Sequence, residues 1–381
     1  MKIKFTFFTF FLSCFSLVAQ IENIIEKYDL PDTVSETSGL LFFNGKLITH
    51  NDSGDAANLY ELDTISGNIT RTINITNATN VDWEDITQDD TYIYIGDFGN
   101  NSNGNRQDLK IYKVLKSDYL NNTNITSEII NFTYEDQADF SSQPNNTDFD
   151  AEAISVYNNQ LVIFTKNWKD NTVNAYTIPK TVGNHSAKKV SSYNSNGLIT
   201  GSTYNRDDDS FVLSGYTNPT GLPFLIHIQL SGILNDDIFS GVIERTDINS
   251  SINASQIEGI TLISNKRYFL SREKVNTVFN GFPIVLTQKL YRFDNDSFSA
   301  LNIKEFHPSS FKIFPNPTQE ILFINGIDIK QISVIDIYGK ILLDQKKSSN
   351  QILIKELITG TYILRIVSKN NTIITKNFIK N

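Results

Sequence analysis

Asp150-Ala151-Glu152-Ala153-Ile154-Ser155 opens a stretch that continues with Gln160-Leu161-Val162-Ile163-Phe164 and ends with Ala175-Tyr176-Thr177-Ile178. Each segment is short and rich in apolar, β-branched or aromatic residues. Polar residues that favour turns separate the segments. This pattern is typical of consecutive antiparallel strands. The stretch therefore predicts a small β-sheet unit whose first strand carries a glutamate near its start.

The same pattern recurs along the chain. Three further copies begin at Glu36, Glu84 and Glu258, and a divergent fifth copy has Thr200 in place of the glutamate. The starting points are separated by 48, 68, 48 and 58 residues. In the four glutamate copies the second strand ends in a charged residue, 16, 13, 14 and 14 positions after the glutamate: Asp52, Asp97, Lys166 and Arg272.

A third and a fourth strand complete the repeat. The third carries a tyrosine, and fourth strands are predicted at 69–73, 128–132 and 301–303. Four strands in about 40–50 residues is the period of a β-propeller blade. Five blades are visible, a sixth could lie in the longer intervals, and residues 21–30 could supply an outer strand that closes the ring. We predict an all-β fold, with a five- or six-bladed β-propeller at 21–306 followed by a small C-terminal β-sandwich at 311–381.

Composition limits the classes of function. The chain has 381 residues, of which 40% are hydrophobic and 20% charged, values typical of a soluble globular protein with more than one domain. The net charge is -9, and the excess of acidic residues lies in the long middle region. Nucleic acid is therefore a poor partner, because duplex binding needs a basic face.

The N-terminus is typical of a secretory signal. Lys2 and Lys4 precede an apolar run that ends near Ala19, so residues 1–19 are predicted to be a signal peptide, and the mature chain is expected to have no membrane span. A membrane anchor and a lipoprotein are the alternatives. The only cysteine, Cys14, would leave with the signal, which excludes disulfides and thiolate zinc sites from the mature protein.

The composition changes near 307–310, and residues 311–381 contain ten Lys/Arg and five Asp/Glu. Short β-rich runs with turn residues between them predict the small sandwich. The segments 314–318, 334–340, 357–364 and 376–380 resemble the C-terminal sorting domain of type IX secretion cargo. This resemblance implies the type IX secretion machinery as a partner, and a protein that is secreted or attached to the outer cell surface. An ordinary accessory sandwich is the alternative.

Candidate functional residues follow from the propeller prediction. The first strand of each blade lines the central channel, so glutamates at equivalent positions should converge there. We consider ten residues as a candidate ligand-binding set: Glu36, Asp52, Glu84, Asp85, Asp97, Arg106, Glu152, Lys166, Glu258 and Arg272. They could form a buried structural network. Alternatively, Glu84, Asp85 and Asp97 could hold calcium, a cation that prefers oxygen ligands, while the basic side chains meet an anion.

The middle region resembles the secreted propellers related to the SdiA-regulated and phytase-like families. The resemblance rests on 38–40, 50–54, 59–63, 83–86 with 95–101 and Arg106, and 258–260. Phytase-like members imply calcium-dependent phosphoester hydrolysis, but this chain lacks a dense basic cluster for several phosphates. We therefore expect a binding propeller with a small anionic or carbohydrate ligand at the channel mouth. A calcium-dependent phosphoesterase and a cell-envelope scaffold are the alternatives, and no reaction can be assigned from the sequence.

Overall fold

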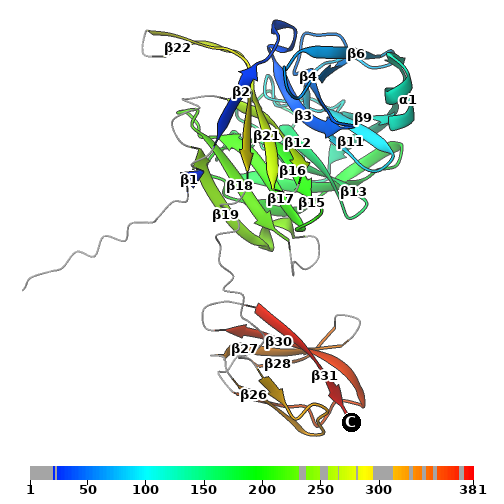
Figure 1. Cartoon of the computed structure of the whole chain (residues 1–381), viewed down its shortest axis with the longest axis vertical. Coiled ribbons are helices and arrows are strands. Elements are labelled where there is room, and N and C mark those ends of the chain that lie inside the picture. Colours follow the sequence, from blue (N-terminus) through cyan, green and yellow to red (C-terminus); the bar gives the residue numbers. More distant parts are fainter. Residues whose placement is uncertain are drawn as a thin grey trace, which may run out of the picture. The chain divides into compact units, whose positions relative to one another are not determined.

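The computed structural model describes residues 20–21, 24–230, 237–248, 256–264, 266–279, 282–294, 312–325, 329–336, 340–345, 350–368 and 373–381. The signal peptide predicted at 1–19, the strand predicted at 301–303 and the boundary predicted between 306 and 311 lie outside these residues. The chain divides into two compact units, Met1–Phe298 and Ser299–Asn381. The all-β prediction is confirmed, since α1 (Lys116–Asn121) is the only α-helix in the described part of the chain (Figure 1).

In the N-terminal unit each of the five repeats forms four antiparallel strands. The first repeat comprises β3 (Thr37–Phe43), β4 (Lys46–Asn51), β5 (Asn58–Leu62) and β6 (Ile69–Ile75), and the second comprises β7 (Trp83–Gln88), β8 (Tyr92–Asp97), β9 (Lys110–Leu115) and β11 (Glu128–Tyr134). The third comprises β12 (Ala151–Tyr157), β13 (Gln160–Thr165), β14 (Val173–Pro179) and β15 (Gly183–Tyr193), and the fourth comprises β16 (Leu198–Asn205), β17 (Ser210–Tyr216), β18 (Pro223–Gln229) and β19 (Val242–Ile248). The fifth comprises β20 (Ile257–Ser264), β21 (Arg267–Arg272), β24 (Lys289–Asp294) and the N-terminal strand β2 (Ile25–Asp29).

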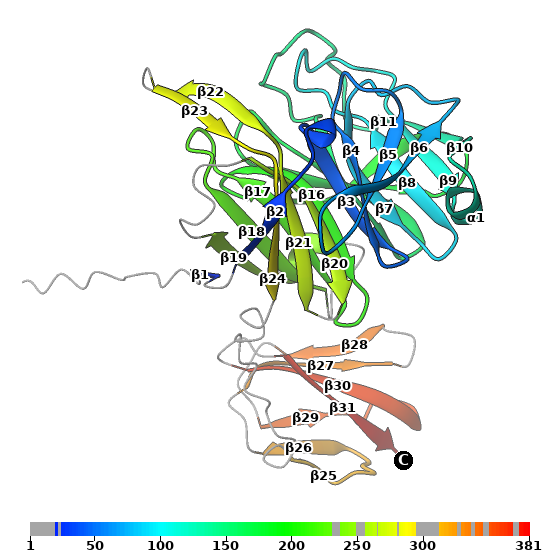
Figure 2. The same cartoon turned by 45° about the horizontal axis from the view of Figure 1, so that its top comes forward.

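The first strands of the repeats are neighbours in a closed cycle. β3 contacts β7, and the contacts continue through β12, β16 and β20 back to β3. The N-terminal strand β2 pairs with β24, so residues 21–30 do supply an outer strand (Figure 2). Parallel pairing of β11 with β15 joins the second and third repeats into one eight-stranded sheet. Residues far apart in sequence are thereby brought to one axis.

Local sequence explains the individual hairpins. Asn44 and Gly45 between β3 and β4 have φ of 49° and 75°, and Asn158 and Asn159 between β12 and β13 have φ of 46° and 60°. Positive φ at both central residues is the requirement of the two-residue turns that match the twist of paired strands, and asparagine and glycine adopt it most readily. The recurring tyrosine lies in apolar clusters that neighbouring repeats share, where an aromatic ring fills the space between sheets. It is buried in four repeats: Tyr60, Tyr112, Tyr176 and Tyr291.

Shorter elements lie around these sheets. β1 (Gln20–Ile21) pairs with β19, and β10 (Asn124–Ile125) pairs with β6. Two single-turn 3-10 helices lie at Asp32–Val34 and Ile238–Ser240. The hairpin of β22 (Val275–Phe279) and β23 (Phe282–Leu286) projects from the N-terminal unit (Figures 1 and 2).

The C-terminal unit contains two sheets. One has the strand order β25 (Lys312–Phe314), β26 (Ile321–Asn325), β29 (Gln351–Leu353), and the other has the order β28 (Ile341–Gln345), β27 (Ile329–Ile335), β30 (Gly360–Ser368), β31 (Ile373–Lys380). Side chains from both sheets form one core, which includes Leu322, Ile352, Ile332, Leu364 and Phe378. Apolar residues that alternate along each strand supply this core.

Candidate functional site

An acidic cavity lies where the first strands of the repeats meet. Its volume is about 110 Å³. We call it the acidic cavity, and its lining residues are Ser38, Asp52, Glu84, Asn101, Glu152, Lys166, Trp168, Tyr216, Gln256, Glu258 and Glu273. Five of the ten candidate residues are among them: Asp52, Glu84, Glu152, Lys166 and Glu258. The structure thus brings together carboxylates from four of the five repeats.

Lys166 is the basic side chain of the acidic cavity, and it is already paired. Its Nζ lies 3.0 Å from Glu152 Oε1, and both side chains are almost completely buried. The ammonium also lies 5.2 Å from the Trp168 ring centroid and 5.3 Å from that of Tyr216. Burial opposes the charged form, but the surrounding carboxylates, above all Glu152, raise the pKa of Lys166. The lysine therefore stays protonated.

The carboxylates of the acidic cavity are crowded and largely shielded from water. Burial, followed by the charge of Asp82, raises the pKa of Asp52 to about 8. Burial raises the pKa of Glu258 to about 7, and burial together with Glu258 raises the pKa of Glu273 to about 9. The pKa of Glu84 is raised well above its usual range, first by burial and then by Glu152. These groups need protons or a cation at neutral pH.

Three carboxylates lie close enough to share one ion. Oxygen atoms of Asp52, Asp82 and Glu84 are all within 4.8 Å of one another. Backbone hydrogen bonds hold their segments together: Trp83 N donates to Asp52 O over 2.8 Å, and Gly99 N donates to Asp82 O over 3.2 Å. Asp82 was not among the residues selected from the sequence.

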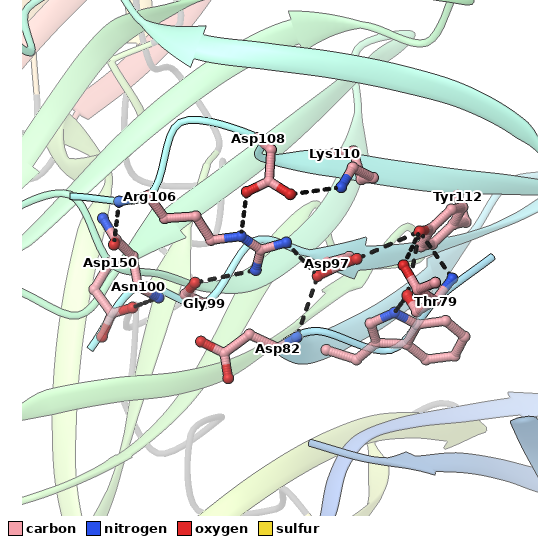
Figure 3. Close-up of polar contacts among 11 residues, drawn as sticks. Thr79, Asp82, Asp97, Gly99, Asn100, Arg106, Asp108, Lys110, Tyr112 and Asp150 are labelled. Atoms are coloured by element: carbon pink, nitrogen blue, oxygen red, sulfur yellow. Dashed lines mark hydrogen bonds and ion pairs between the residues drawn. The ribbon is translucent and has the colours of Figure 1, made fainter. Parts of the chain in front are cut away.

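Asp97 and Arg106 lie next to Asp82 (Figure 3). Arg106 Nη2 donates to Asp97 Oδ1 over 2.6 Å, and the same carboxylate oxygen accepts from Asp82 N over 3.2 Å. Arg106 also donates to Gly99 O over 3.2 Å and to Asp108 over 2.9 Å. Both residues, predicted as ligand-binding, support the backbone next to the acidic cavity and do not line it.

Asp85 is completely buried between first strands. Its carboxylate accepts backbone N–H groups of Ile86 (2.8 Å), Ile154 (2.9 Å) and Ser202 (3.3 Å), which belong to β7, β12 and β16. All its contacts are with the scaffold. Of the three side chains predicted to hold calcium, only Glu84 lines the acidic cavity, because Asp85 and Asp97 are engaged in these hydrogen bonds.

Glu36 and Arg272 also lie away from the acidic cavity lining. Glu36 is exposed, and its backbone contacts the Asn51–Asp52 segment. The Arg272 guanidinium donates twice to Thr287 O, over 2.7 and 3.2 Å, and lies 5.6 Å from the Tyr291 ring. Arg272 therefore fastens the loop before β24.

Sequence reasoning missed several residues, although a signal for some of them was present. Asp82, Asp150 and Gln256 share one repeat position, two residues before the glutamate. Asp150 accepts from Trp168 Nε1 over 2.7 Å and from Asn100 N over 2.5 Å, and so orients the tryptophan. Gln256 lines the acidic cavity. Tyr216 ends the second strand of its repeat, 16 positions after Thr200, and Glu273 follows the second strand of its own, 15 positions after Glu258. Both therefore occupy the repeat position from which Asp52 and Lys166 were selected, although only charged residues were sought there.

The fold has distant similarity to solved structures. PorZ, a surface component of the type-IX secretion system of Porphyromonas gingivalis, is 11% identical, with 93% of this chain and 60% of that chain covered and a TM-score of 0.33. A GH43 endo-arabinanase from Bacillus licheniformis is 13% identical, with 70% of this chain and 96% of that chain covered and a TM-score of 0.40. A GH32 β-fructofuranosidase from Bombyx mori is 9% identical, with 94% of this chain and 89% of that chain covered and a TM-score of 0.38. This chain thus spans about three fifths of the PorZ chain. No curated protein matches it in sequence.

The C-terminal unit has a family assignment. Residues 312–381 match the secretion system C-terminal sorting domain, which confirms the resemblance drawn from the four tail motifs. Among the described residues no helix combines the length and apolarity needed to cross a membrane. Residues 312–381 are a type IX sorting domain, and the protein is one that is secreted or displayed at the cell surface.

Proposed function

We propose that the N-terminal unit is a five-bladed β-propeller and that its acidic cavity binds a small carbohydrate at the cell surface or outside the cell. Five sets of four antiparallel strands, whose first strands contact one another in a closed cycle, support the blade number. We also propose that the two sheets of the C-terminal unit, which share one core, form a β-sandwich. Domain limits of 21–306 and 311–381 belong to the same proposal.

The lining of the acidic cavity is the observation that carries the carbohydrate proposal. Carboxylates accept strong hydrogen bonds from hydroxyl groups, and the amides of Asn101 and Gln256 both donate and accept. The half-buried Trp168 offers a ring face for the apolar side of a sugar, and its orientation is held by Asp150. A volume of about 110 Å³ is below the ~300–1,000 Å³ of most ligand sites. The cavity therefore suits one end of a ligand, such as a terminal sugar ring.

Charge separates a carbohydrate from an anion. Four glutamates and Asp52 line the acidic cavity, whereas Lys166 is paired with Glu152 and Arg106 with Asp97. An anionic ligand would face this negative charge without a free basic partner in the lining. The same argument weakens the proposal of a phosphoesterase, which needs basic groups for its phosphate. A scaffold without a small ligand stays a prediction that the following experiment addresses.

Binding to the full-length chain tests the proposal. We expect a panel of neutral mono- and oligosaccharides to contain a ligand that raises the melting temperature, whereas phosphate esters leave it unchanged. Trp168→Ala and Glu258→Gln should each weaken binding at least tenfold in calorimetry. Asp90→Asn is the control, because it changes an exposed carboxylate away from the acidic cavity. If no compound in the panel raises the melting temperature, the result favours a scaffold. Binding of phosphate esters alone would favour the phosphoesterase.

A further inference from the structure

We propose that Ca²⁺, a divalent cation that prefers oxygen ligands, binds between Asp52, Asp82 and Glu84. The inference deepens the proposed function, because the ion would lie in the same acidic cavity and offer a contact for ligand hydroxyls. The site differs from the calcium set expected from the sequence in two of its three residues. Asp52 and Asp82 take the place of Asp85 and Asp97.

The spacing of the three carboxylates suits one calcium ion. Ca²⁺ takes oxygen ligands at about 2.3–2.6 Å, so two oxygens on opposite sides of the ion lie about 5 Å apart. One carboxylate oxygen from each of Asp52, Asp82 and Glu84 lies within 4.8 Å of the other two. Mg²⁺ needs shorter bonds and a stricter octahedron, which three carboxylates from separate segments satisfy less readily.

Two carboxylates in this cluster have polar atoms without a partner. The Glu84 side chain is buried, with 5% of its surface exposed, and within the described part of the chain no hydrogen bond or ion pair reaches its carboxylate. Asp52 Oδ1 is buried and receives no N–H or hydroxyl group from the described residues, and the Asp52 carboxyl faces that of Asp82. Buried carboxylate oxygens are almost always paired in folded proteins. A cation between these groups would supply the missing partner.

The charge around the cluster favours a cation strongly. Glu152, Glu258 and Glu273 line the same cavity. Lys166 is the basic side chain in the lining of the cavity, and its Nζ lies 3.0 Å from Glu152 Oε1. At neutral pH the remaining carboxyls therefore either hold protons or leave an excess of negative charge, and a divalent ion would replace those protons or reduce that charge.

Gly99 provides the space that the cluster occupies. A Cβ at this position would lie 2.0 Å from Glu84 Oε1 and 2.5 Å from Asp82 Oδ2, which is closer than real Cβ atoms approach. Asp97 and Arg106 hold the backbone here, since Arg106 donates to Gly99 O and Asp97 accepts from Asp82 N. Any side chain at position 99 would displace two proposed ligands without removing either.

Calcium titration of the full-length chain tests this inference. After treatment with EDTA, we expect calorimetry to show one Ca²⁺ per chain, with tighter binding than Mg²⁺ and a rise in melting temperature. Asp82→Asn keeps the size of the side chain and should weaken Ca²⁺ binding at least tenfold. Gly99→Ala should weaken it similarly although every ligand oxygen remains. Asp90→Asn, which changes an exposed carboxylate away from the acidic cavity, should leave the affinity unchanged.

The outcomes separate the two proposals. Absence of both binding heat and a melting shift at millimolar Ca²⁺, or equal affinity in the wild type and Asp82→Asn, would overturn the inference. A circular dichroism melt of each metal-free variant shows whether it folds. If Gly99→Ala does not fold, the affinity of Asp82→Asn for Ca²⁺ decides the test. Ca²⁺ binding without any sugar ligand would leave this site standing and remove the carbohydrate proposal. If the protein binds no Ca²⁺ and its sugar binding is unchanged in EDTA, the carbohydrate proposal stands and the calcium site is removed.

Discussion

Single acidic residues near the first strands serve two different purposes, and their hydrogen bonds tell them apart. Asp85 accepts three backbone N–H groups from three strands and faces no solvent. Glu84, its neighbour in sequence, points into the acidic cavity. Fully paired buried groups rigidify a fold, whereas crowded unpaired charges weaken it and are retained at binding sites.

Substitution of these two neighbours should therefore have opposite effects on stability. Asp85→Ala leaves three buried N–H groups without an acceptor and should lower the free energy of unfolding by about 3 kcal/mol. Glu84→Gln removes a repelled charge and should leave the metal-free protein equally or more stable. Urea denaturation of both variants in EDTA measures the difference. Equal losses would mean that Glu84 is as much a part of the scaffold as Asp85.

The turn between β7 and β8 shows how an element is fastened to its neighbour. Asp89 accepts the N–H groups of Thr91 and Tyr92, the hydroxyl of Tyr94 and, over 2.7 Å, the ammonium of Lys180, which follows β14 in the next repeat. Partial burial opposes ionisation, but Lys180 and the backbone donors together lower the pKa of Asp89 to about 2. One side chain thus sets the turn and links two repeats.

The contribution of Asp89 to stability should depend on pH. Its pKa is lower in the folded state than the ~3.9 of an unfolded aspartate, so the stabilisation is present above about pH 4 and is lost as pH falls towards 2. We expect Asp89→Asn to cost about 1 kcal/mol at pH 7, after allowance for solvent screening, and progressively less below pH 4. Asp90→Asn, at the exposed next position, is the control. A pH-independent loss in Asp89→Asn would contradict this assignment.

At the scale of the whole molecule, closure of the ring concentrates carboxylates from separate repeats into one space. Each repeat alone would leave its glutamate in water. Once the first strands contact one another, burial raises the pKa of Glu258 to about 7 and that of Glu273 to about 9. The folded chain therefore holds protons that the unfolded chain, with a glutamate pKa of about 4.3, has already released.

The metal-free protein should consequently become less stable as pH rises from about 5 to 9. A raised carboxyl pKa stabilises the fold at low pH, and this stabilisation is lost as pH increases through the folded pKa, at up to about 1.4 kcal/mol per pH unit for each proton retained. Denaturation in EDTA across this range measures the decline. Glu273→Gln should flatten it between pH 7 and 9, whereas Asp90→Asn, in an exposed turn away from the acidic cavity, should not. Constant or rising stability over the range would contradict the proposed crowding.

The sequence by itself determined the strands, the repeats and the sorting tail, because alternation, turn residues and short motifs act over neighbouring positions. It also indicated that Glu84, Glu152 and Glu258 approach one axis. Only the tertiary structure decided which acidic groups remain available: Asp85 is occupied by backbone groups 69 and 117 residues away, and Asp97 by Arg106. Two partners of Asp85 lie in other repeats, which local sequence does not show, and the pairing of Asp97 with Arg106, nine residues further along the same repeat, depends on how the intervening loop folds. Asp82 shares its repeat position with Asp150 and Gln256, but only the fold shows that its carboxylate lies beside those of Asp52 and Glu84.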